Sequence, residues 1–355
     1  MRALWSAGWA SAVTAYFTVG ATESPIMVGI MVAAVFLGCV LGRLLRRRDA
    51  LIGGWSSAMA LAVIAVLVWI DAFDSLAFMS TIAAVIASAG FVLGAPARSP
   101  EAPTRAGRIL VPILRGFALA IVMLSAGAAA SVHVVWALTL AALLTLGWAI
   151  SSLRIPAVAL NGKRSGVDPI ELLQGVTIAA AFGGWAALLI IILPSIGPAA
   201  PWPAVHEEAI AVGLMGALGM IGAGLGFGLV RPLVESGAHP RSAWLLGPLA
   251  AGMLLLMVAR PGSFAVAGFA AVLIVSALTA AAIRMTAARA PELAAEDTIY
   301  ARSALPAVLA TLALGALVCG LLADVAEVRD VVLLPAAGVA IVTCWIDLRR
   351  AVSAG

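Results

Sequence analysis

The chain has 355 residues, of which 63% are hydrophobic and only 11% are charged, and its mean hydropathy is +1.13. This composition excludes an ordinary soluble globular protein and is typical of a chain that crosses a membrane many times. The net charge of +4 and the isoelectric point near 9.5 do not indicate a nucleic-acid partner, because the position of the basic residues has a membrane explanation.

Long apolar stretches recur along the whole sequence. Each is close to the roughly 20 residues that a helix needs to cross about 30 Å of hydrocarbon. Lipid offers no partner for backbone N–H and C=O groups, and no stretch shows the alternating pattern of an outer-membrane barrel, so we expect helices. The sequence predicts twelve spans, at 4–21, 25–42, 51–70, 75–95, 110–130, 132–150, 172–193, 208–229, 243–259, 263–283, 304–323 and 331–346.

Lysine and arginine fall almost entirely into alternate gaps between these spans. With the N-terminus inside, only Arg260 and Arg329 of the 21 basic residues lie outside, whereas acidic residues occur on both sides. This is the positive-inside rule, which concerns Lys and Arg rather than net charge. We therefore expect an all-α polytopic membrane protein with both termini inside. If the first span is instead a cleaved signal peptide, eleven spans remain and every later loop keeps its side.

The segment between the sixth and seventh spans divides the chain into two six-helix halves. We expect an N-terminal six-helix bundle at 1–152, a cytoplasmic linker at 153–170 and a C-terminal six-helix bundle at 171–355. The halves echo each other, because Val28-Gly29-Ile30-Met31 in the second span is similar to Val212-Gly213-Leu214-Met215 in the eighth. Both stretches lie in the second span of a six-span set, which indicates an internal repeat.

A cluster of glycine and arginine closes the second span. The stretch runs Gly38-Cys39-Val40-Leu41-Gly42-Arg43-Leu44-Leu45-Arg46-Arg47. Gly38 and Gly42 form a small-xxx-small pair that lets a neighbouring helix approach closely. The arginines then hold this end of the span at the inner surface, against anionic lipid headgroups.

This stretch, together with the six-plus-six arrangement, resembles the major facilitator superfamily. The family motif between spans two and three runs Gly, three residues, Asp-Arg, one residue, Gly-Arg-Arg, and four positions match it: Gly38, Arg43, Arg46 and Arg47. Gly42 stands where the Asp should be, and Leu45 replaces the second Gly. In the family, that Asp is thought to tie the loop to an adjacent helix and to steady one access state. The resemblance implies a transporter that works by alternating access but lacks this latch.

Ionisable residues inside a span are costly, so they are functional candidates. No Asp, Glu or Lys lies in the middle third of any predicted span. Arg115, early in the fifth span, either reaches the inner surface or faces a cavity and binds an anionic group. Gln174, one turn into the seventh span, is expected to bond between helices, with solute contact as the alternative.

Further candidates are expected at the outer side. Glu23 follows the first span and is either a loop charge or part of a cavity mouth. Asp71 and Asp74, between the third and fourth spans, are solvated loop carboxylates or line a vestibule that attracts cations. His133 begins the sixth span and is expected at the interface, with proton sensing as the alternative.

Tryptophan is abundant, and most of its positions match an aromatic belt at the two membrane surfaces. The residues near predicted span ends are Trp5, Trp69, Trp136, Trp148, Trp202 and Trp345. Trp9, Trp55 and Trp185 lie deeper, where they either line an apolar cavity or pack in the core or against lipid.

No enzyme motif is present: the Ser/His/Asp spacing, the Gly-rich phosphate loop and HExxH are all missing from the sequence. The three cysteines have the spacing of neither a metal site nor a disulfide framework. We therefore expect no catalysis, no cofactor and no metal. Membrane glycosyltransferases generally carry acidic pairs in a first outer loop, where this chain has Glu23 alone, so a lipid-modifying enzyme is the third hypothesis.

The first hypothesis is a transporter in a bacterial inner (plasma) membrane. So few charges line its spans that a lipophilic or weakly polar solute, including a lipid, is expected. The second hypothesis is a non-transporting polytopic subunit that scaffolds a larger membrane complex. The expected partners are membrane lipids, a small-molecule solute or lipid and, under the second hypothesis, protein subunits, but not nucleic acid.

Overall fold

The computed structural model describes residues 2–20, 24–45, 47–73, 75–95, 105–153, 158–159 and 207–235, with short pieces at 273, 277, 310, 313–318 and 320–321. The spans expected at 172–193, 243–259 and 331–346, and most of those at 263–283 and 304–323, lie outside these residues. The described elements are α1 (Arg2–Gly20), α2 (Pro25–Leu44), β1 (Arg47–Arg48), α3 (Ala50–Trp69), α4 (Ala77–Leu93), α5 (Arg105–Val132), α6 (Val134–Ser151), β2 (Val158–Ala159) and α8 (Glu207–Glu235).

Every described helix with its own label coincides with an expected span. Five stretches are long and apolar enough to cross a membrane: Ile26–Leu44, Ala50–Trp69, Ile109–Val132, Val134–Ser151 and Ala209–Leu229. Helix α4 is also apolar but has only 17 residues. The chain is therefore a multi-pass membrane protein that is helical in its described part, apart from the two-residue strands β1 and β2, which the sequence did not predict.

Helix α5 is longer than its predicted span of 110–130. It begins at Arg105, so Arg105 and Arg108 belong to the helix rather than to the inner loop. Hydropathy locates where a helix enters the membrane, whereas arginine is a good helix former and lets the helix continue into water. Pro112 lies inside α5, as membrane helices tolerate.

Polar side chains fix the starts of three helices. Ser24 Oγ accepts a hydrogen bond from the N–H of Met27 at 3.4 Å, and Pro25 occupies the first turn of α2. Asp49 Oδ1 accepts from the N–H of Ile52 at 3.0 Å and starts α3. His133 Nδ1 accepts from the N–H of Val135 at 3.3 Å, so this candidate residue has a role as the cap of α6.

The turn after α3 is a Schellman motif with Asp71 at the position where glycine is usual. The N–H of Asp71 donates to the carbonyl of Val68 at 3.2 Å, and the N–H of Ala72 donates to the carbonyl of Leu67 at 2.9 Å. Asp71 is exposed and has a φ of 53°, in the left-handed region. Its carboxylate also follows the negative end of the helix dipole. The turn itself therefore does not select an acid.

We expect Asp71→Gly to raise the free energy of unfolding by about 1 kcal/mol and Asp71→Val to lower it by about as much, because only glycine adopts a positive φ freely. Asp71→Asn should change little, since asparagine also tolerates this conformation. Thermal unfolding of the three variants in one detergent checks the order. Equal stability of the glycine and valine variants would contradict the assignment of the turn.

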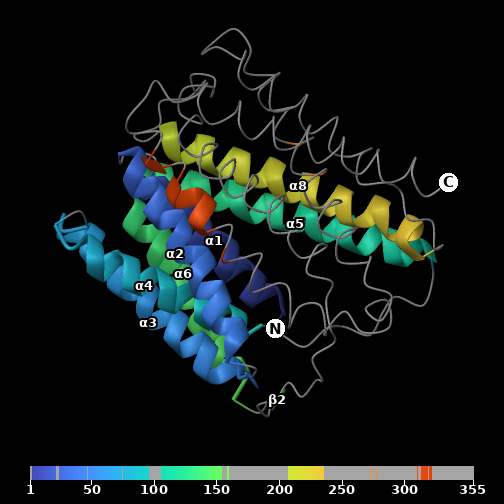
Figure 1. Ribbon diagram of the computed structural model, residues 1–355, viewed down its shortest axis with the longest axis horizontal. Coiled ribbons are helices and arrows are strands. Elements are labelled where there is room, and N and C mark those ends of the chain that lie inside the picture. The colour runs from blue at the N-terminus through green and yellow to red at the C-terminus, as the bar shows by residue number, and fades with distance from the viewer. Residues whose placement is uncertain are drawn as a thin grey trace, which may run out of the picture.

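The first six helices form one bundle (Figure 1), in which α3 packs on α4 and α6, α2 packs on α4, and α1 packs on α5 and α6. Its core is apolar and contains Tyr16, Met31, Ile64, Phe73 and Leu138. Helix α8 runs beside α5 (Figure 1). We call the end of the bundle that carries β1 and β2 the inner end, and the end with the α3–α4 turn the outer end.

Candidate functional site

Helices α5 and α8 are in close backbone contact through glycines. A Cβ on Gly127 would lie 2.8 Å from the carbonyl oxygen of Ala209 and 2.9 Å from the Cα of Gly213. Nearer the inner end, a Cβ on Gly116 would lie 2.6 Å from the carbonyl oxygen of Met220. The two glycines of α5 are about 16 Å apart along the helix. We call this contact the α5–α8 seam, and only glycine fits its crossing points.

The same packing recurs between α2 and residues 316–320. A Cβ on Gly29 would lie 2.8 Å from the carbonyl oxygen of Ala316 and 2.9 Å from the Cα of Gly320. These are the distances found around Gly127, and in both places the partner segment presents an alanine followed four residues later by a glycine. We call this second contact the α2 seam.

Each of the two similar tetrapeptides of the sequence lies at one of these seams. Gly29 belongs to the stretch in the second span and Gly213 to the similar stretch in the eighth. A Cβ on Gly213 would lie 2.9 Å from the Cα of Gly127 and 3.0 Å from the carbonyl oxygen of Met123. Each repeat therefore supplies one glycine to one seam, and the two contacts have equivalent geometry.

Helix α1 carries a buried polar stripe. Ser11, Thr14 and Thr18 are all buried, and their spacing of three and four residues places them on one face. This face lies about 90° around the helix from Gly8. Gly8 packs against Thr145 of α6. The other described neighbours of α1 are α2, α5 and α8. The Thr14 and Thr18 hydroxyls donate to carbonyls of their own helix, which leaves their oxygens as acceptors.

Tyr16 is a buried tyrosine whose hydroxyl finds no hydrogen-bond partner in the part of the chain that the structure describes. Its ring packs edge-on against Phe73, with centroids 6.4 Å apart, at the outer end of the bundle. An unsatisfied buried hydroxyl costs about 1–3 kcal/mol, so its retention calls for an explanation beyond packing.

The glycine pair of the loop motif lies against α4, which is the close approach that the small-xxx-small spacing predicts. Gly38 packs on Val85, and a Cβ on Gly42 would lie 2.6 Å from the carbonyl oxygen of Ala89. Gly42, at the position of the family's acid, therefore has no room for any side chain. Arg43 is half-buried in the last turn of α2, where a cation suits the helix dipole.

The last turn of α4 ties the inner ends of the bundle together, because its free carbonyls need donors. Three separate segments supply them: the indole of Trp5 to Phe91 at 3.1 Å, the indole of Trp148 to Gly94 at 3.2 Å, and the N–H of Asp49 to Leu93 at 3.0 Å. Beside this turn β1 pairs antiparallel with β2, with Arg47 opposite Ala159 and Arg48 opposite Val158. These bonds join the inner ends of α1, α3 and α6 to α4.

Trp148 is 2% exposed, so it does not belong to the aromatic belt in which the sequence placed it. We expect Trp148→Phe to lower the free energy of unfolding by about 2 kcal/mol, because the Gly94 carbonyl loses its donor and a cavity remains. The matched control is Trp136→Phe in the same helix, which is 69% exposed and should change stability by less than about 0.5 kcal/mol. Equal melting temperatures for the two variants would contradict the role of the α4 turn.

Among the described residues, the predicted candidates Arg115, Asp71 and His133 do not form one cluster. Arg115 is exposed next to Gly116 in the inner part of α5, and it forms no ion pair within the described residues. Asp71 and His133 are exposed at the outer end. Four other candidates lie outside the described residues: Glu23, Arg46, Asp74 and Gln174. Among described side chains, no group of three His, Cys, Asp or Glu could hold a metal ion.

The sequence reading missed the α1 stripe, Tyr16 and Asp49. The three-and-four spacing of Ser11, Thr14 and Thr18 was a readable signal for a polar helix face. Asp49 directly before the apolar run of α3 was a readable helix start. Nothing in the sequence identified Tyr16, because burial without a partner is a property of the packed bundle.

No family model matches the sequence, and no curated protein matches it. Among solved structures, the nucleoside transporter NupG matches with a TM-score of 0.64 and 11% identity, covering 98% of this chain and 96% of that chain. A bacterial metal transporter matches with a TM-score of 0.64 and 16% identity, with the same coverage of both chains. At these identities the likeness concerns the fold.

Proposed function

We propose that this chain, which has the fold of the major facilitator transporters, moves a solute across the membrane by alternating access. The observation that carries the proposal is the pair of equivalent glycine contacts at the α5–α8 and α2 seams. In our proposal the halves 1–152 and 171–355 rock against each other at these seams, as the halves of transporters built from structural repeats do. The hydrogen bonds that join α1, α3 and α6 to α4 at the inner end support movement of that half as one body.

The proposed solute is lipophilic or weakly polar and carries no net charge. Well inside the described spans, Arg115 is the one charged residue. The buried stripe of α1 consists of the neutral hydroxyls of Ser11, Thr14 and Thr18, which suit hydrogen bonding rather than charge pairing. A nucleoside, which NupG transports according to its name, is likewise uncharged, although it is more polar.

Purified protein in liposomes tests the proposal. Uptake of a nucleoside, a lipophilic amphiphilic dye and a divalent cation should be measured in parallel against empty liposomes. We expect uptake of the neutral nucleoside or the dye and none of the cation. Uptake of the cation alone would contradict the proposed solute class, and no uptake across a broad panel of neutral solutes would contradict transport.

The Tyr16 hydroxyl, which has no hydrogen-bond partner within the described residues, allows a test of whether the solute contacts this residue. We expect Tyr16→Phe to raise the free energy of unfolding by about 1 kcal/mol, since it removes an unsatisfied buried group. If that hydroxyl serves the solute, the same variant loses uptake at least about tenfold while its melting temperature rises. A variant that is both more stable and fully active would show that Tyr16 has no part in transport.

The second candidate is a polytopic subunit that keeps this fold and scaffolds a membrane complex. The observation that favours it is Gly42, because its contact with Ala89 excludes the acid that serves as the family's latch. Purification in mild detergent separates the two candidates. Stoichiometric co-purifying subunits support the scaffold, and a lone monomer supports the transporter.

A further inference from the structure

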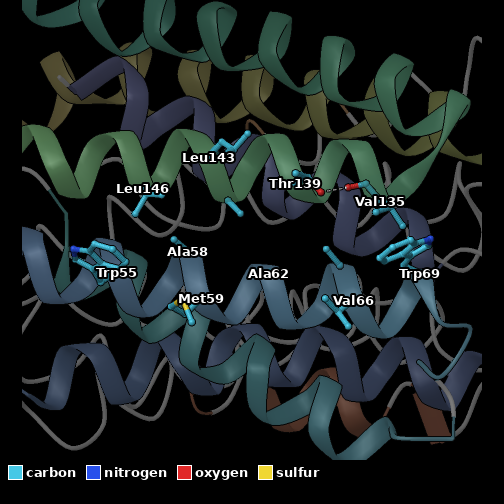
Figure 2. Close-up of a pocket in the computed structure, with 12 residues that line it drawn as sticks. Trp55, Ala58, Met59, Ala62, Val66, Trp69, Val135, Thr139, Leu143 and Leu146 are labelled. Carbon is cyan, nitrogen blue, oxygen red and sulfur yellow. Dashed lines mark hydrogen bonds between the residues drawn. The ribbon is translucent and has the colours of Figure 1, made fainter.

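A groove runs along the exposed face between α3 and α6 (Figure 2). Its ends are marked by Trp55 and Trp69 of α3, and small side chains such as Ala58 and Ala62 open its middle. Every lining side chain is apolar except Thr139, whose hydroxyl donates to the carbonyl of Val135 at 2.7 Å. The groove therefore offers hydrocarbon contact along its length and no free hydroxyl donor.

The dimensions of the groove fit a hydrocarbon chain. Its volume is about 320 Å³, and from Trp55 to Trp69 it extends about 21 Å along α3. The mean cross-section is therefore about 15 Å², several-fold below the roughly 80 Å² of an α-helix about 10 Å across. A single acyl chain fills such a groove, whereas a partner helix would enter it with one row of side chains only.

The two tryptophans suit the ends of a lipid site. Trp5 and Trp148 donate their indole N–H to backbone carbonyls of α4. Trp55 and Trp69 make no such bond within the described residues, and their indole nitrogens point away from the middle of the groove (Figure 2). Indoles in this arrangement pack their rings on hydrocarbon and keep their N–H for polar groups at the membrane surface.

The backbone of a basic segment lies at the inner mouth. Trp55 is less than two turns from the start of α3, and Leu146 is less than two turns from the end of α6, so β1 and β2 lie at this end. Both residues of β1 are arginines, Arg47 and Arg48, and Arg46 precedes them. The acid in this stretch, Asp49, is engaged as the cap of α3.

From this geometry we propose that the α3–α6 groove binds one acyl chain of an anionic phospholipid from the inner leaflet, with its phosphate headgroup at the β1 arginines. Basic residues near a membrane surface attract anionic headgroups, and the groove supplies the apolar contact that a surface charge alone lacks. The site is independent of the proposed transport path, since it lies on the face of the bundle between α3 and α6.

Native mass spectrometry of the whole purified chain tests this site. The delipidated protein is titrated with phosphatidylglycerol or phosphatidylcholine of equal chain length. We expect about tenfold preference for phosphatidylglycerol. Ala62→Phe, which fills the groove, should reduce tight binding of both lipids at least about fivefold. Arg47→Gln/Arg48→Gln should keep binding but lose the preference.

The matched control is Ile121→Phe on α5, at a lipid-facing position that is 65% exposed and far from the groove in sequence. It should bind phosphatidylglycerol like the unchanged protein. Met59→Trp narrows the groove from a rim position that is 59% exposed. It replaces Ala62→Phe as the groove variant if Ala62→Phe fails to fold. Equal lipid retention in the groove variants and in the control would overturn the proposal. So would a protein subunit that binds the unchanged chain and is lost from the groove variants.

Discussion

We expect Gly127→Ala to lower the free energy of unfolding by about 2 kcal/mol, although alanine is the better helix former. The added methyl would lie 2.8 Å from the carbonyl oxygen of Ala209 and 2.9 Å from the Cα of Gly213, so the two helices must move apart. Because the same geometry holds at Gly29, Gly29→Ala should cost about as much. Uptake into liposomes should fall at least about tenfold in both variants, since the seams carry the proposed movement.

The control is the same glycine-to-alanine change at a position outside the seams. Gly147 lies in α6, and a Cβ there would meet no atom within 4 Å. Gly147→Ala should therefore raise the free energy of unfolding by about 0.5–1 kcal/mol and leave uptake unchanged. Thermal unfolding of all three variants in one detergent gives the comparison. A Gly127→Ala protein as stable as Gly147→Ala would show that the seam is not tightly packed.

Gly42→Asp introduces the acid that the motif of the major facilitator superfamily carries at this position, and it should destabilise the protein more than an alanine at either seam does. The new Cβ would lie 2.6 Å from the carbonyl oxygen of Ala89, and the carboxylate would enter a tightly packed α2–α4 contact without a donor. Overpacking and an unpaired buried charge together should cost on the order of 3 kcal/mol or more. The expected result is a strong loss of folded protein in detergent.

Gly42→Ala separates the cost of overpacking from the cost of the unpaired charge. It adds only the methyl, so it should cost about 1–3 kcal/mol, and the difference from the Asp variant measures the charge. Size-exclusion profiles and melting temperatures of both variants provide the readout. If Gly42→Asp folds like the unchanged chain and is more active, the contact with Ala89 is not the reason that the latch is missing.

Helix positions were predictable because the membrane thickness sets their length and the hydropathy is strong. Thus α2 and α3 begin within about one residue of the predicted spans, whereas α5 extends beyond its span because hydropathy does not register a helix that continues into water. The close approach at Gly38 and Gly42 was predictable from spacing. That α4 is the neighbour was not, because sequence spacing marks a helix face and not its partner.

The candidate site was harder to predict, for a physical reason. Arg115, Asp71 and His133 were chosen because charge in or near a membrane is costly, yet Arg115 lies in the inner part of α5 whereas Asp71 and His133 lie at the outer end. The residues that form the seams are glycines, whose importance depends on contacts between helices distant in sequence. The similar tetrapeptides around Gly29 and Gly213 were visible in the sequence, but their matching contacts required the fold.

Spin-label distances across both ends of the α5–α8 seam test alternating access most directly. One label pair replaces Val132 and Ile210 at the outer end, and the other replaces Leu110 and Leu229 at the inner end, after Cys39, Cys319 and Cys344 are changed to serine. In liposomes alternating access predicts two distance populations at each end. The longer outer distance should accompany the shorter inner distance as neutral solute is added. A single unchanging distance at both ends would contradict it.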